Sequence, residues 1–107
     1  MTIRDNLKKG AAEMVILHML QKQEMYGYQI AHELGELSGG DFTLQEGSMY
    51  PTLYRLIEGN YVVDRNEIVN KRLRKYYSIT DEGREHLKVL VSEFRAVTAG
   101  IERILAE

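Results

Sequence analysis

Apolar residues recur at helical spacing in two segments of the N-terminal half of the chain. Residues 11–21 are apolar on most sides, which predicts a helix at the centre of the core or at a subunit contact, and residues 1–10 are a candidate extension of it. Residues 28–38 predict a second helix with one apolar face, formed by Ile30, Ala31, Leu34 and Leu37. The glycine at position 27 marks the break between the two helices.

A third helix, expected over residues 48–59, has two unlike faces. One is an apolar stripe at i, i+4, i+7 and i+8, formed by Met49, Leu53, Leu56 and Ile57. The other carries Tyr50, Pro51, Thr52, Tyr54 and Arg55. Ser48 is the expected N-cap, which would put Pro51 in the first turn, where proline is tolerated.

Two strands are expected to follow as a hairpin. Residues 61–65 and 74–80 are rich in β-branched and aromatic side chains, and the tip of the hairpin is expected at residues 70–73. Tyr77 and Ile79 share the face that is expected to point into the core, while Tyr76 and Ser78 face outwards. Thr80 is a good N-cap for the last helix.

The last helix, expected to run to about Leu105, carries a heptad seam. Its apolar residues are spaced 3, 4, 3, 4 and 3 apart: Leu87, Leu90, Phe94, Val97, Ile101 and Ile104. A helix of roughly 25 residues is about 37 Å long, more than a domain of this size covers. Part of the seam therefore needs a partner, and a second copy of the chain is the simplest one. Packing on its own domain alone is the alternative.

Length and composition favour one ordinary globular domain. The chain has 107 residues, 44% of them hydrophobic, and no cysteine. The start has no signal-peptide core, and the longest apolar run is too short to span a bilayer, so we expect a cytoplasmic protein without a membrane partner. We divide the chain into an N-terminal domain, residues 1–80, and a C-terminal dimerisation helix, residues 81–107.

Positive charge is concentrated in the hairpin. Residues 61–80 carry five Lys/Arg and two Asp/Glu, whereas residues 1–60 carry five and eight, and residues 81–107 carry four and six. Local potential rather than the net charge of −2 decides where a polyanion binds. A solvated hairpin without a partner is the alternative reading of this cluster.

Three helices, a hairpin with a basic tip and a last helix are the order of a winged helix-turn-helix, an α+β fold that is mostly α. In this fold the third helix enters the major groove of DNA and the hairpin reaches the flanking backbone or minor groove. Ser48, Tyr50 and Thr52 are candidate phosphate contacts, and Arg55 could reach a base edge or a phosphate. Further candidates open the second helix or lie in the hairpin: Tyr28, Gln29, Lys71, Arg72, Arg74 and Lys75.

Each candidate has a structural alternative. Tyr50 and Tyr54 could border the core, and Arg55 could pair with Glu58. A winged helix that binds another protein, without sequence-specific DNA binding, is the alternative function. The three histidines lie on three different helices, so no metal or cofactor site is expected, and no catalytic constellation points to an enzyme.

Three segments resemble the PadR family of bacterial transcription regulators: residues 26–30 (YGYQI), 47–56 (GSMYPTLYRL) and 74–83 (RKYYSITDEG). The single C-terminal helix is similar to that of the small-subtype members. The resemblance implies a homodimer that binds a palindromic operator, usually as a repressor, and is released by a small phenolic or aromatic effector.

The resemblance also implies roles for residues. The third-helix contacts to DNA would be Ser48, Tyr50, Pro51, Thr52 and Arg55, with Tyr28 on the second helix and Lys71, Arg72 and Arg74 on the wing. The first and last helices would form the dimer, so the expected interface includes Leu17 of the first helix as well as the seam of the last one. An effector pocket would be lined by Met14, His18, Phe94 and Val97, for which plain dimer core is the alternative.

Two features depart from the family pattern. Many wings carry a Gly-Arg-Pro-like tip, whereas this chain has Lys71-Arg72-Leu73. Drug-binding members place tryptophans at the dimer pore, and this chain contains no tryptophan.

Overall fold

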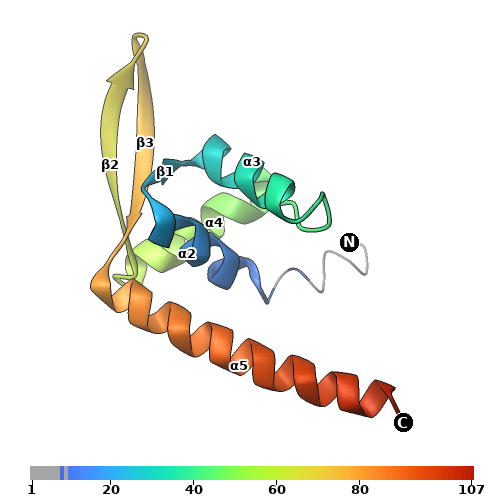
Figure 1. Cartoon of the computed structure of the whole chain (residues 1–107). Helices are drawn as coiled ribbons and strands as arrows, with labels where there is room; N and C mark the ends of the chain where they lie inside the picture. Colours follow the sequence, from blue (N-terminus) through green and yellow to red (C-terminus); the bar gives the residue numbers. More distant parts are fainter. Residues whose placement is uncertain (1–7, 9) are drawn as a thin grey trace.

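The computed structural model describes residue 8 and residues 10–107, which form a winged helix-turn-helix with a long last helix (Figure 1). Within residues 10–60, three helices precede the wing: α2 (Ala12–Lys22), α3 (Gly27–Leu37) and α4 (Glu46–Glu58). The predicted fold class is confirmed. The candidate extension of the first helix lies mostly outside the described residues.

Helix α2 is the centre of the core. It contacts α3, α4, α5 and β3, and four of its side chains are almost completely inaccessible: Ile16, Leu17, Met19 and Leu20. A largely apolar helix that packs against several elements buries most of its surface, as the sequence suggested, although His18, Gln21 and Lys22 remain exposed. Leu17, which we expected at the dimer contact, is therefore enclosed by its own chain.

Helix α4 begins two residues before the predicted Ser48. The backbone N–H groups of Ser48 and Met49 donate to the carbonyl of Gln45 at 3.0 and 2.9 Å, so Gln45 is the N-cap. The expectation that Ser48 caps the helix is wrong, and Pro51 lies beyond the first turn. Because proline has no N–H, the helical acceptor four residues earlier, the carbonyl of Gly47, loses its usual donor.

The sheet has three antiparallel strands in the order β1-β3-β2, where two were predicted. Strand β1 (Met25–Tyr26) pairs with β3 (Arg72–Ile79), which pairs in turn with β2 (Val62–Val69). The two hairpin strands continue further towards the tip than predicted, to a two-residue turn at Asn70 and Lys71 that lies within the predicted tip. Both turn residues have positive φ, 52° and 65°, as a tight hairpin turn requires.

The alternation of β3 agrees with the prediction for its aromatic residues. Tyr77 is buried beside Met25, its partner on β1, and joins the hydrophobic core. Burial raises the pKa of Tyr77 to about 12. Tyr76 lies on the opposite face, where it contacts Tyr26 edge-on at 5.7 Å between ring centroids.

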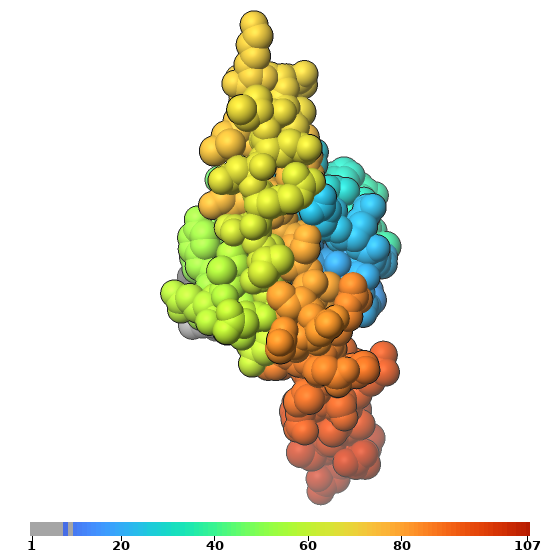
Figure 2. All heavy atoms as spheres, turned by 90° about the vertical axis from the view of Figure 1, so that its left-hand side faces the viewer, coloured from blue at the N-terminus to red at the C-terminus, as the bar shows by residue number. Residues whose placement is uncertain are grey.

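Helix α5 (Asp81–Leu105) is capped by Thr80, whose Oγ1 accepts the N–H of Gly83 at 2.9 Å, as the predicted N-cap should. Its first turns pack on α2, and the rest extends past the domain (Figures 1 and 2). Among the described helices, none combines the length and apolar character needed to cross a membrane.

Candidate nucleic-acid interface

Helix α4 presents one exposed stripe on the side opposite its buried Met49, Leu53 and Leu56. The stripe consists of Ser48, Pro51, Tyr54, Arg55 and Glu58. Three of the predicted DNA contacts, Ser48, Pro51 and Arg55, therefore lie together on an accessible surface. The two-faced pattern in the sequence predicted the exposure of Pro51, Tyr54 and Arg55, but it also placed Tyr50 and Thr52 on this face.

Thr52 differs from the prediction, because it is only 3% exposed. Its Oγ1 donates to the carbonyl of Ser48 at 2.9 Å and accepts from Arg55 Nη2 at 3.1 Å. Both hydrogen bonds are internal, so Thr52 cannot contact a phosphate in this conformation. Its role in the structure is to hold the Arg55 guanidinium.

Arg55 also has an acidic neighbour on α2. Its Nε lies 3.9 Å from Glu13 Oε1, rather than beside Glu58 as the alternative supposed. At that distance, between exposed side chains, the attraction is weak and easily replaced by a phosphate. Thr52 and Glu13 thus orient Arg55 while leaving its outer edge accessible.

Tyr50 is half-buried and joins α4 to the start of α3. A Cβ added at Gly27 would collide with the Tyr50 phenol oxygen and come within 3.2 Å of Met49 Cε. Burial raises the pKa of Tyr50. Packing between the two helices therefore explains Tyr50 at least as well as a DNA contact does.

The start of α3 contributes Tyr28, which is 72% exposed and stacked on His32 with ring centroids 6.1 Å apart. Gln29 beside it is half-buried. A hollow of about 560 Å³ lies at the start of α4, lined in part by Ser48, Pro51 and Arg55. Backbone N–H groups at a helix start favour anions, so this hollow suits a phosphate group.

The wing contains cations of two kinds. Lys71 and Arg72 at the tip are exposed and make no ion pair with any residue that the structure describes. Arg74 lies 4.1 Å above the centroid of the Tyr26 ring, and Lys75 Nζ lies 3.5 Å from Asp64 Oδ2. Of the predicted wing contacts, Lys71 and Arg72 are therefore free for a ligand, whereas Arg74 is already engaged.

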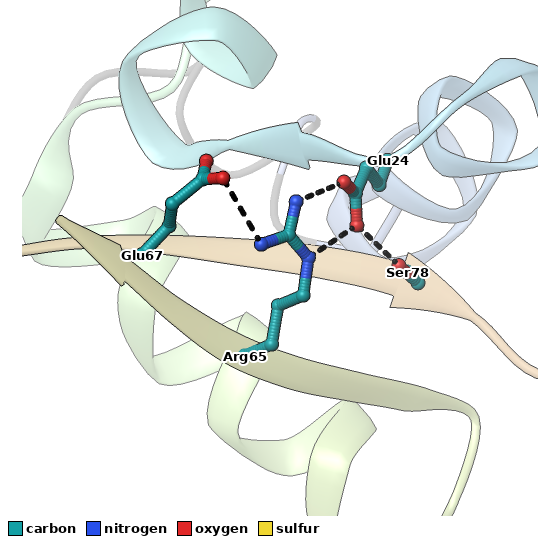
Figure 3. Close-up of polar contacts among 4 residues, drawn as sticks. All are labelled: Glu24, Arg65, Glu67 and Ser78. Carbon is teal, nitrogen blue, oxygen red and sulfur yellow. Dashed lines mark hydrogen bonds and ion pairs between the residues drawn. The ribbon is translucent and has the colours of Figure 1, made fainter. Parts of the chain in front are cut away.

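A cluster on the outer face of the wing was not predicted (Figure 3). Arg65 donates from Nε to Glu24 Oε2 at 3.0 Å and from Nη2 to Glu24 Oε1, and the Ser78 hydroxyl donates to the same carboxylate at 3.2 Å. The hydrogen bonds from Arg65 hold the pKa of Glu24 below its usual value. These residues are far apart in the sequence, and only the strand pairing brings them together.

The four residues of the predicted effector pocket are not brought together within one chain. His18 lines a groove of about 900 Å³ between α2 and α5, with Leu87, Val91 and Arg95, but the lining includes none of the other three. Met14 packs against the core, while Phe94 and Val97 are exposed on α5. The described residues contain no cluster of three metal-ligating side chains.

Comparison with known proteins agrees with this geometry. The family model described as the transcriptional regulator PadR-like family matches residues 16–89. A transcriptional regulator of Mycobacterium tuberculosis is 31% identical over 75% of this chain and 72% of its own length. The negative transcriptional regulator PadR of Bacillus subtilis is 32% identical, over 67% of this chain but only 40% of that protein.

A solved structure gives the same result at the level of the fold. The crystal structure of a PadR-like transcriptional regulator from Bacillus cereus superposes with a TM-score of 0.79 and 30% identity, covering 95% of this chain and 98% of that one. The match includes the helices, the wing and the last helix.

Proposed function

Because the chain belongs to the PadR-like family of transcriptional regulators, we propose that it is a homodimeric repressor that binds a palindromic DNA operator. The family is one of regulators and not of enzymes. The observation that carries the proposal is the accessible stripe of α4, with an oriented Arg55, on the same domain as a wing whose tip cations are free.

In this proposal α4 lies in the major groove. Arg55 donates to a base edge, for which the guanidinium fork favours guanine, and Ser48 and the start of the helix contact phosphates. Lys71 and Arg72 neutralise flanking phosphates, so binding weakens as salt rises. Thr52, which is buried, positions Arg55 and does not itself contact the DNA.

The proposed dimer uses the part of the seam that its own domain leaves exposed: Phe94, Val97, Ile101 and Ile104. Leu87 is buried in the protomer and Leu90 packs against the same core, so we leave both out of the interface, together with Leu17. Exposed apolar residues at heptad spacing are well suited to pack against a second α5.

Release by a small aromatic effector is the remaining part of the proposal. The groove between α2 and α5 is the cavity best placed for one, because a ligand there would touch the joint between the DNA-binding unit and the proposed dimer helix. Such a ligand would weaken DNA binding only if it bound the DNA-free arrangement more tightly.

Selection of bound sequences from a random duplex pool tests the proposal. We expect an enriched palindrome whose half-sites are about one helical turn apart, since two α4 helices related by two-fold symmetry reach successive major grooves. Arg55→Gln should then weaken operator binding about tenfold or more and relax the preference at one base pair in each half-site, as the loss of a bidentate base contact does.

Glu58→Gln is the matched control on the same exposed stripe and should bind at least as tightly as the wild type, because it removes a negative charge. If no sequence is enriched over the starting pool, the protein is not a sequence-specific DNA-binding repressor. The alternative, a winged helix that binds another protein, would then be favoured.

A further inference from the structure

The far end of the wing carries an exposed apolar pair. Ile68 on β2 and Leu73 on β3 are register partners, and they are 75% and 70% exposed. By the alternation of β3, Leu73 lies on the same face as the buried Tyr77, four residues further along. The core-facing side of the hairpin therefore continues past the end of the core, where no described residue covers it.

The surroundings of this pair are strongly basic. Residues 66–75 contain four Lys/Arg and one Asp/Glu. Of these four cations, Lys71 and Arg72 have no ion-pair partner among the described residues, and both lie close to Leu73 in the sequence. A second copy of the wing would bring like charges together. Charge complementarity instead favours, as the partner of this surface, a polyanion that also has apolar surface.

The shape of the tip indicates which polyanionic surface it fits. The two-residue turn at Asn70–Lys71 is among the tightest connections between two strands, and Figure 2 shows the hairpin (yellow) tapering as it leaves the domain. The minor groove of B-DNA is only about 6 Å wide and is walled by deoxyribose, whose C–H groups are apolar. Aliphatic side chains are known to enter it beside basic ones.

We propose that Ile68 and Leu73 pack against the deoxyribose walls of the minor groove that flanks each half-site, while Lys71 and Arg72 hold the adjoining phosphates. This inference rests on the function proposed above and adds to it a contact that involves no charge. The pair should therefore contribute affinity that salt does not screen, and favour flanking base steps that widen or kink easily.

The test compares two double variants of the full chain on the selected operator. Ile68→Thr/Leu73→Thr keeps residues that favour strands but makes the pair polar. We expect it to weaken binding about tenfold with an unchanged slope of log affinity against log salt, because no phosphate contact is lost. Lys71→Gln/Arg72→Gln should also weaken binding, but with a slope shallower by up to about 2.

Hydroxyl-radical footprinting locates the contact, because these radicals attack deoxyribose from the minor groove. The wild type should protect sugars on both flanks of the operator, and the threonine variant should lose that protection while keeping it at the centre. Circular dichroism and the thermal midpoint show whether the hairpin is still folded. If it is not, Leu73→Thr alone replaces the double variant.

Three results would overturn the inference. The first is a threonine variant that matches the wild type in affinity and flank protection, and the second is a wild type that leaves the flanking sugars unprotected. The third is a variant that changes only the sedimentation or the binding to anionic phospholipid vesicles, which would identify a second copy or a lipid surface as the partner. A wild type that selects no operator would refute the proposed function itself.

Discussion

Gly27 determines how closely α4 approaches α3. Replacing it by alanine should destabilise the protein by about 1–3 kcal/mol, because the new methyl group overlaps the Tyr50 phenol oxygen and crowds Met49. Urea unfolding measures the change. Gly47→Ala in α4 is the matched control, since no heavy atom lies within 4 Å of its added Cβ, and it should stabilise by up to about 1 kcal/mol.

Removing the phenol oxygen tests the stated cause. In a Tyr50→Phe background, the same glycine substitution should cost less than it does in the wild type. An additive pair of changes, or a Gly27→Ala protein as stable as Gly47→Ala, would show that Tyr50 is not the obstacle.

Single residues also show what periodicity reveals and what it does not. The buried positions Met49, Leu53 and Leu56 follow from helical spacing and were predicted correctly. Thr52 lies beside them and is buried too, because its hydroxyl can donate a hydrogen bond to the backbone carbonyl four residues earlier. In the sequence, the hydroxyl of Thr52 indicated a surface residue. Only the hydrogen bonds in the structure explain why it is buried instead.

At the scale of the element, the Glu24–Arg65 pair ties the wing to the end of α2. The pKa of Glu24 is lowered in the folded protein, so its contribution to stability is present above the unfolded pKa and is lost as pH falls through the folded one. Glu24→Gln should therefore destabilise at pH 7, and the difference from the wild type should shrink between about pH 5 and pH 3. Thermal unfolding across this range measures it.

The control for that prediction is Glu67→Gln. Glu67 Oε1 lies 3.8 Å from Arg65 Nη1, which makes a looser ion pair than the two hydrogen bonds to Glu24. Its substitution should have a smaller effect at neutral pH. A Glu24→Gln difference that stays constant down to pH 3 would mean that the carboxylate charge is not what stabilises the wing.

The elements of the candidate site were predicted unevenly. The spacing of apolar residues was enough to predict α4 and the last helix. Strand β1 was missed, because it has only two residues and is too short to show any alternation. The first strand of the wing was predicted too short because Asn66 and Glu67 are poor strand formers, although the position of the tip was predicted correctly. Their strand conformation comes from register, which the turn at Asn70 and Lys71 fixes.

In the molecule as a whole, the first part of α5 packs on its own domain and the rest is exposed to solvent. The seam read from the sequence is continuous, yet Leu87 is buried in the protomer and Ile104 is 68% exposed. A heptad pattern indicates which face of a helix is apolar but not which body covers it. The structure, 58 Å in its longest dimension, shows where its own domain stops.

The exposed half of this seam carries the last prediction. Phe94 is 49% exposed in the protomer, so Phe94→Asp should leave the protomer folded but place a charge in the proposed apolar contact. Sedimentation should then report a monomer. Affinity for the full operator should fall by about a hundredfold or more, because the two half-sites are no longer bound by one linked pair of subunits.

Affinity for a duplex with a single half-site separates this cause from damage to the DNA-binding surface. It should be unchanged in Phe94→Asp, because α4 and the wing lie away from the substitution. Ser92→Asp, which adds the same charge at an exposed polar position of α5, should remain a dimer and bind the full operator normally. A Phe94→Asp protein that sediments as a dimer would require the two subunits to meet through another surface, and the half-site spacing could not then be set by α5.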